Sequence, residues 1–180
     1  SDPKTLYEDA ESDISSSNYQ LAQDKLRILK NKFPYSKHSV IAKLRIADVF
    51  FLQENFAEAA ASYETFRDLH PTHEKAPYAA YRTAKSYYLD IPSNIARDLT
   101  AASRAQDAYQ DFLNKYPTSE YAEESRKDLI EVKSQLSQKE LYIAKFYIRE
   151  DKYEAAKARL TKILQLYPDT PEAKIASEKM

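Results

Sequence analysis

The stretch that decides the fold is residues 59–72, with the sequence AAASYETFRDLHPT. An alanine lies twelve residues before Pro71, Tyr63 lies eight before it and Phe66 lies five before it. On a helix these positions share one face, where the small alanine permits a second helix to approach closely and the rings fill the remaining space. Pro71 ends the helix, and Thr72 can cap the next one. The stretch therefore predicts the second helix of a helical hairpin.

The same pattern occurs four times, and each copy ends at a proline. The terminal motifs are Lys32-Phe33-Pro34-Tyr35-Ser36, Leu69-His70-Pro71-Thr72, Lys115-Tyr116-Pro117-Thr118-Ser119 and Leu166-Tyr167-Pro168-Asp169-Thr170. Counting back twelve, eight and five residues from each proline gives one alanine and two large residues: Ala22, Leu26 and Leu29; Ala59, Tyr63 and Phe66; Ala105, Tyr109 and Phe112; Ala156, Leu160 and Ile163. Repetition of this kind is typical of stacked helical hairpins.

The predicted first helices carry a matching alanine, at Ala10, Ala47, Ala84 and Ala144. In three repeats this alanine precedes that of the second helix by twelve residues, but Ala84 and Ala105 are twenty-one apart. We expect about nine inserted residues around positions 89–95, with Pro92 favouring an irregular surface loop. From Pro117 to Pro168 there are fifty-one residues, about one helix more than a repeat of roughly 34 needs. Residues 119–150 therefore predict one long helix shared by neighbouring hairpins.

These spacings predict an all-α fold, a tetratricopeptide-like α-solenoid of about four to five helical hairpins in a single domain over residues 4–180. The repeats are expected at roughly 4–34, 37–71, 75–117 and 119–168, with a partial repeat at 170–180 whose helix is capped by Thr170. Turns inside the hairpins carry Asn18, Asn55 and Asp151-Lys152 where many such repeats have glycine. We expect Asn and Asp to adopt the left-handed conformation there.

Composition excludes several classes of function. The 180 residues contain no Gly and no Cys, and 27 basic against 28 acidic residues give a net charge of −1. Nucleic acid is therefore not an expected partner, and neither disulfides nor thiolate metal sites can form. His70 and His73 are three apart, but Pro71 between them favours a capped turn over a metal site. Because no phosphate-binding or nucleophile motif is present, we expect no enzyme, no cofactor and no metal.

The order of the motifs, together with the insertion around positions 89–95 and the long helix over residues 119–150, resembles that of the BamD (YfiO, ComL) family of outer-membrane assembly lipoproteins. The resemblance extends over about residues 6–180. The resemblance is carried by residues 33–36, 66–73, 109–112, 116–122, 144–147 and 167–170, together with Tyr78, Tyr81, Leu136 and Glu140. It implies a protein on the periplasmic face of the bacterial outer membrane, lipid-anchored through an N-terminal cysteine that this sequence lacks. It also implies two sets of partners: the POTRA domains of the BamA barrel insertase with other lipoproteins of the assembly machinery, and the C-terminal segments of unfolded outer-membrane proteins.

Two groups of residues are candidates for these contacts. Side chains spaced three, four or seven apart on the first helix of the third repeat share one face, and with charged and aromatic residues of the preceding repeat they form the predicted client-peptide surface: Arg45, Asp48, Phe51, Tyr78, Tyr81, Lys85 and Tyr88. The predicted insertase-binding residues lie on the long helix and the last hairpin: Lys133, Lys139, Glu140, Arg149 and Arg159. The alternative interpretation is that the tyrosines only pack between helices and the charges form a solvated face.

Other functions remain open at this point. The first is a CpoB-like periplasmic repeat protein that coordinates cell-wall synthesis with envelope constriction, whose repeats also use a Tyr-Pro-Ser motif; the insertion and the long shared helix count against it. The second is a cytosolic co-chaperone that grips the C-terminal carboxylate of a heat-shock protein. That site needs Lys and Asn along the first helices, where this chain has Leu44 and Asp48.

Overall fold

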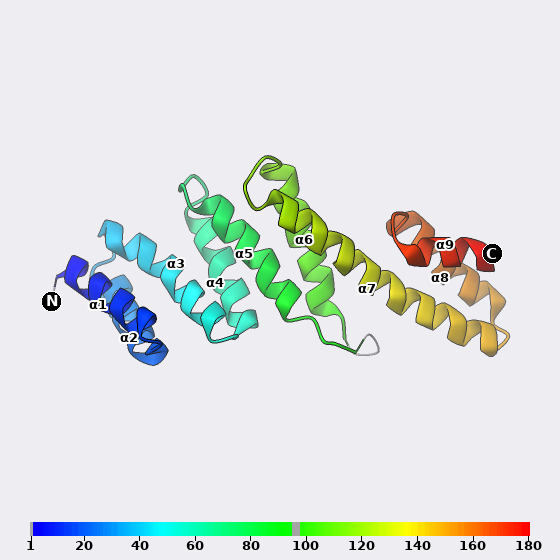
Figure 1. Cartoon of the computed structure of the whole chain (residues 1–180), viewed down its shortest axis with the longest axis horizontal. Coiled ribbons are helices and arrows are strands. Elements are labelled where there is room, and N and C mark those ends of the chain that lie inside the picture. The colour runs from blue at the N-terminus through cyan, green and yellow to red at the C-terminus, as the bar shows by residue number, and fades with distance from the viewer. Residues whose placement is uncertain (1, 95–97) are drawn as a thin grey trace. The chain divides into compact units, whose positions relative to one another are not determined.

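The computed structural model describes residues 2–94 and 98–180, and every regular element in these residues is a helix (Figure 1). The helices are α1 (Pro3–Ser15), α2 (Tyr19–Lys32), α3 (Lys37–Leu52), α4 (Phe56–Leu69), α5 (Ala76–Leu89), α6 (Thr100–Lys115), α7 (Ala122–Arg149), α8 (Tyr153–Leu166) and α9 (Pro171–Lys179). The predicted all-α fold is confirmed. Residues 90–94 are not helical, as expected for the insertion, while Ile95 lies outside the described residues.

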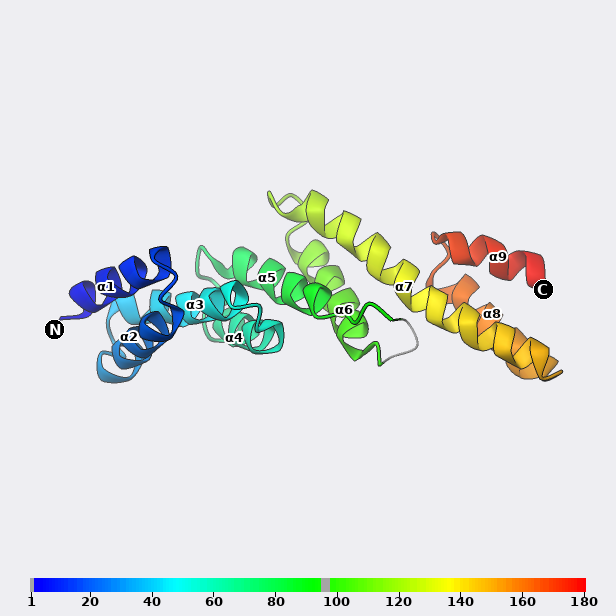
Figure 2. The same ribbon diagram turned by 60° about the horizontal axis from the view of Figure 1, so that its bottom comes forward.

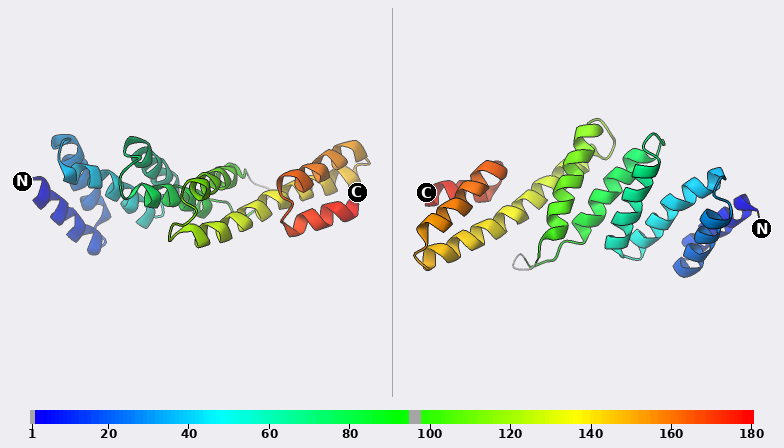
Figure 3. Two further views of the ribbon diagram at one scale, coloured as in Figure 1. Left: turned by 90° about the horizontal axis from the view of Figure 1, so that it is seen from above. Right: turned by 180° about the vertical axis from the view of Figure 1, so that it is seen from behind.

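The chain divides into two compact units, Ser1–Leu89 and Asp90–Met180. In the first unit α1 packs against α2, α3 against both α2 and α4, and α5 against α4. Helix α4 thus lies between α3 and α5 (Figure 3). The boundary separates α5 from α6, which the sequence assigns to one repeat, so the pairing of these two helices and the single domain stay predictions.

The second unit is built on α7, whose 28 residues confirm the predicted long shared helix. Helix α6 packs against its N-terminal half and α8 against its C-terminal half, and α9 contacts both α7 and α8 (Figure 2). The helix begins three residues later than residue 119. The reason is that Ser119 lies in the preceding turn, where its Oγ accepts a hydrogen bond of 3.2 Å from the backbone N–H of Tyr121.

The core consists of the positions that the spacing predicts. All twelve residues counted back from the four prolines are at most 3% exposed, and the four alanines of the first helices are fully buried. Burying one such Tyr, Phe, Leu or Ile side chain stabilises the fold by roughly 1.5–3 kcal/mol. The expected helix after Pro168 is present as α9, where the Thr170 hydroxyl accepts a hydrogen bond from the backbone N–H of Ala173, while its assignment to a partial repeat stays a prediction.

The hairpin turns correct the prediction about left-handed residues. Ser17, Glu54 and Asp151 have φ of 61°, 60° and 56°, whereas Asn18 and Asn55 have φ of −85°. In all three turns the N–H after the left-handed residue bonds the carbonyl five positions earlier, as in Asn55 to Phe50 at 2.9 Å. This is the Schellman motif, which requires positive φ at the first residue beyond the helix cap. The prediction was therefore right for Asp151 and one residue too late for Asn18 and Asn55.

Candidate functional site

A buried carboxylate on α3 joins three helices of the first unit. Asp48 directly follows the core residue Ala47 and is 7% exposed. Its Oδ1 accepts hydrogen bonds from the hydroxyl of Tyr63 on α4 and, at 2.7 Å, from the hydroxyl of Tyr78 on α5. Its Oδ2 accepts a bond of 2.8 Å from Nη1 of Arg45. These three hydrogen-bond donors offset the cost of burying the charge of Asp48.

Arg45 extends the network to α1. Its Nε and Nη2 donate to the two carboxylate oxygens of Glu11 at 2.7 Å and 3.0 Å, which is the bidentate geometry that a guanidinium favours. Burial lowers the pKa of Arg45, but its hydrogen bonds to Glu11 and Asp48 raise that pKa overall. Glu11 and Asp48 occupy the same repeat position, directly after the small alanine of the first helix. The first two repeats thus each place an acidic group beside the same arginine.

The two tyrosines act as hydrogen-bond donors, and their surroundings raise the pKa of each phenol above its ordinary value of 10. Burial, and next the charge of Asp48, raises the pKa of Tyr78 to about 12, and the same two causes raise the pKa of Tyr63 further. Both phenols therefore keep their protons at neutral pH and can donate them to Asp48.

Aromatic rings cover this polar network. The ring of Phe51 lies edge to face with those of Phe56 at 5.3 Å and Tyr63 at 6.5 Å, and Tyr63 with Tyr78 at 6.0 Å. The guanidinium of Arg82 lies 4.0 Å from the Phe51 ring centroid and 5.4 Å from that of Tyr78. We call this group the Asp48 cluster; it consists of Glu11, Arg45, Asp48, Phe51, Tyr63, Tyr78 and Arg82.

The cluster contains four of the seven residues predicted to bind a client peptide, namely Arg45, Asp48, Phe51 and Tyr78. Lys85 and Tyr88 form a separate cation–π contact, with the ammonium 5.0 Å from the ring. Tyr81 is 7% exposed, so it forms part of the core rather than an open surface.

Sequence reasoning missed Glu11, Tyr63 as a hydrogen-bond donor, and Arg82. A signal for Glu11 was present, since it occupies the position equivalent to Asp48. Another was present for Arg82, which follows Tyr78 by four residues and so shares its helix face.

The predicted insertase-binding residues all lie on α7 and α8 of the second unit. Glu140 accepts hydrogen bonds from Arg159 at 3.0 Å and Lys162 at 2.8 Å, which joins the two helices. Burial raises the pKa of Glu140, but the hydrogen bonds from Lys162 and Arg159 lower that pKa overall. Glu140 and Arg159 therefore form an internal ion pair. Lys133 and Lys139 are half-buried, and Arg149 is exposed at the end of α7.

An exposed stripe on α7 was not predicted. Tyr142 is 54% exposed and Phe146 is 45% exposed, and with Arg149 they follow a spacing of four and three residues that places them on one face. We call these three residues the α7 stripe. Tyr153, at the start of α8, is 62% exposed. Exposed aromatic side chains beside a cation are frequent in protein interfaces.

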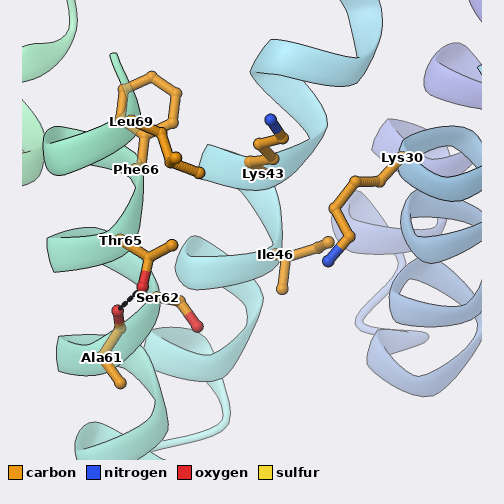
Figure 4. Close-up of a pocket in the computed structure, with 8 residues that line it drawn as sticks. All are labelled: Lys30, Lys43, Ile46, Ala61, Ser62, Thr65, Phe66 and Leu69. Atoms are coloured by element: carbon orange, nitrogen blue, oxygen red, sulfur yellow. Dashed lines mark hydrogen bonds between the residues drawn. The ribbon is translucent and has the colours of Figure 1, made fainter. Parts of the chain in front are cut away.

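A pocket between α2, α3 and α4 uses a different face of α3 (Figure 4). Ile46, Phe66 and Leu69 provide apolar walls, and Lys30 and Lys43 lie at its edge. The Nζ of Lys43 lies 3.4 Å from Nε2 of His70. The pocket shares no residue with the Asp48 cluster.

The histidines near Pro71 pack against the core. The rings of His70 and His73 each lie 5.3 Å from that of Phe66. The Nδ1 of His73 accepts a hydrogen bond from the backbone N–H of Lys75, so it helps to form the turn before α5.

None of the described helices is both long and apolar enough to cross a membrane.

Solved structures with a similar fold are tetratricopeptide-type proteins. Residues 41 to the end of MamA from Desulfovibrio magneticus are 18% identical with a TM-score of 0.50, and the match covers 92% of this chain and 75% of that one. A tetratricopeptide repeat protein from Parabacteroides merdae is 15% identical with a TM-score of 0.51, over 97% of this chain and 57% of that one. At this identity the likeness supports the fold alone.

Sequence comparisons identify the family. Proteins named outer membrane protein assembly factor BamD are similar to this chain in Vibrio cholerae (28% identical, 98% of this chain, 77% of the relative), Neisseria gonorrhoeae (29%, 92% and 65%) and Caulobacter vibrioides (29%, 93% and 56%). The chain thus spans between about half and three quarters of these relatives. The model of the YfiO family, described as outer membrane lipoprotein, matches residues 1–180. The chain therefore belongs to the YfiO family of outer membrane lipoproteins.

Proposed function

We propose that this protein is a non-enzymatic assembly factor for β-barrel outer-membrane proteins, with separate surfaces for client segments and for the barrel insertase. The observation that carries this proposal is the match to the family over the whole sequence, together with relatives that are named assembly factors. The stacked hairpins supply a scaffold whose binding side chains are held in place before a partner arrives.

In this proposal the Asp48 cluster binds the C-terminal segment of an unfolded client. Phe51, Tyr78 and Arg82 are partly exposed above a buried polar network, so they present rings and a cation from fixed positions. Rings supply contact area at low entropic cost, while charges orient the ligand. An extended segment with alternating apolar and polar residues fits such a surface. Lys85 and Tyr88 on the same helix extend the proposed surface.

The proposed insertase surface lies on the second unit. The α7 stripe offers two exposed rings next to Arg149, and Lys133 and Lys139 add positive charge along the same helix. Aromatic anchors supply most of the affinity of an interface, whereas the surrounding charges increase the association rate. The partner in this proposal is the POTRA region of the BamA-type insertase. Glu140 and Arg159 would support the surface by holding α7 against α8.

The same proposal places the protein on the periplasmic face of the outer membrane, held by a lipid on a cysteine that precedes this sequence. The family description as outer membrane lipoprotein supports this location. The family match and the relatives named assembly factors favour the assembly role over the cell-wall role of a CpoB-like protein.

The direct experiment is surface-plasmon resonance with the immobilised POTRA domains of the insertase encoded in the same genome. Saturable binding of the full chain at micromolar concentrations is expected. An unrelated tetratricopeptide protein of similar charge serves as the negative control. If the chain binds no better than this control, the assembly role is wrong.

A further inference from the structure

Arg82 is held in place without an acidic partner. Its guanidinium lies 4.0 Å from the centroid of Phe51 and 5.4 Å from that of Tyr78. Within residues 2–94 and 98–180 no carboxylate forms an ion pair with it, and its Nε is buried without a hydrogen-bond acceptor. Arg45 and Arg67 in the same unit both have carboxylate partners.

Both carboxylates of the Asp48 cluster already accept hydrogen bonds from other residues. Asp48 accepts hydrogen bonds from Arg45, Tyr63 and Tyr78, and the second carboxylate, Glu11, is engaged by both remaining guanidinium donors of Arg45. The cluster therefore contains two arginines and two carboxylates, but both carboxylates bind Arg45 rather than Arg82. A partly buried cation without a carboxylate partner is unfavourable, and an incoming carboxylate would compensate its charge.

The position of Arg82 also determines what it can bind. The Phe51 ring lies against the guanidinium carbon, whereas the N–H donors lie around the edge of the planar group. Of its three nitrogens, only Nε is buried without a partner, so Nη1 and Nη2 remain at the surface. Two parallel donors on a fixed plane match the two oxygens of a carboxylate, and nearby rings strengthen the bond by excluding water.

We propose that Arg82 binds a carboxylate group of the client peptide, with an apolar or aromatic residue of that peptide packed beside it on Phe51 and Tyr78. The inference rests on the proposed client surface and adds the group that surface recognises. Such a carboxylate could be the C-terminal α-carboxylate or an acidic side chain. The chemistry at Arg82 is the same, and the experiment separates the two sources.

The test uses three fluorescein-labelled ten-residue peptides of alternating apolar and polar residues ending in Phe. One has a free C-terminus and no acidic side chain, the second is its C-terminal amide, and the third is the amide with Glu before the last residue. Anisotropy titrations compare the wild-type protein with Arg82→Gln. A carboxylate peptide should bind the wild-type protein about tenfold more tightly than the uncharged amide, as expected for a charge-assisted hydrogen bond. The peptide that shows the preference identifies the source of the carboxylate.

Arg82→Gln should abolish this preference, whereas Arg82→Lys should restore part of it. Arg27→Gln removes an equal charge from an exposed position on α2 and should keep the full preference. Equal binding of all three peptides to the wild-type protein would overturn the role of Arg82 while the client surface stands. A preference that survives in Arg82→Gln would do the same. If no peptide binds the wild-type protein, the client surface is wrong and the inference fails with it.

Discussion

Tyr78 on α5 donates a hydrogen bond of 2.7 Å to Asp48 on α3, although α4 packs between the two helices. The hydroxyl of Tyr63 on that intervening helix donates to the same oxygen. One carboxylate therefore joins three consecutive helices, and it lies directly beneath the rings and the arginine of the proposed client surface. In the proposed function, Asp48 therefore supports both the stability of the first unit and the client surface.

Replacing Asp48 by Ala should be strongly destabilising. The change leaves the buried hydroxyl of Tyr63 without an acceptor and removes one carboxylate from Arg45, so we expect a loss of about 3 kcal/mol in the free energy of unfolding. Tyr63→Phe should cost about 1 kcal/mol alone and much less in the Asp48→Ala background, because the hydrogen bond is then already absent. Urea denaturation of the two single variants and the double variant measures this coupling. Strictly additive costs would show that the two side chains do not interact.

Glu54→Gly should stabilise the protein. Glu54 has φ of 60°, which is unfavourable for a residue with a Cβ atom, and glycine removes this strain. After the larger entropy of glycine in the unfolded chain is subtracted, we expect a gain of about 0.5–1 kcal/mol in thermal or urea denaturation. Asn55→Gly is the matched control, because φ of Asn55 is −85° and no strain is relieved there. A gain in the control but not at Glu54 would contradict the assigned turn geometry.

Glu140 should make the second unit sensitive to acid. Its folded pKa lies below the ordinary value of 4.5 because the hydrogen bonds from Lys162 and Arg159 outweigh burial. A lowered folded pKa gives a stabilisation that is present above pH 4.5 and is lost as pH falls through the folded value. At neutral pH the free energy of unfolding of the wild-type protein should exceed that of Glu140→Gln by about 1 kcal/mol. The difference is this small because Arg159 and Lys162 are partly exposed, and it should vanish in acid.

Urea denaturation over a range of acidic pH values measures this dependence. Glu123→Gln is the matched control on the same helix, because the Glu123 side chain is 90% exposed and should contribute little at any pH. A Glu140 contribution that does not change with pH would indicate that its interaction with α8 is not ionic.

The helices and the core follow from local sequence rules. Ala59, Tyr63 and Phe66 are buried because a small residue and two large ones at helical spacing suit only a face against another helix. The distance between Pro117 and Pro168 predicted the long helix α7, and no proline interrupts residues 122–149. The turns were harder, because the left-handed position depends on where the last helical hydrogen bond closes, and composition drew attention to Asn55 instead of Glu54.

The surfaces were only partly predictable. Tyr78 and Phe51 were recognised from helical spacing, but the contact of Arg82 with Phe51 joins two helices and depends on side-chain rotamers that a single sequence does not specify. The pairing of Glu140 with Arg159 is of the same kind, for their separation along the chain carries no periodic signal. Tyr81 was expected on an open surface but is buried, which shows that helical spacing alone does not determine exposure.

The account's central claim is that client segments and the insertase bind different surfaces. It is tested most directly by measuring both affinities for two variants, Phe51→Ala in the Asp48 cluster and Phe146→Ala with Arg149→Glu in the α7 stripe. Peptide binding is followed by fluorescence anisotropy and POTRA binding by surface-plasmon resonance, with circular dichroism to confirm that both variants are helical. We predict that Phe51→Ala weakens peptide binding about tenfold and leaves POTRA binding unchanged, and that the α7 variant does the reverse. The assignment of the two surfaces is contradicted if either variant weakens the binding of both ligands equally. It is also contradicted if Phe51→Ala weakens only POTRA binding and the α7 variant weakens only peptide binding.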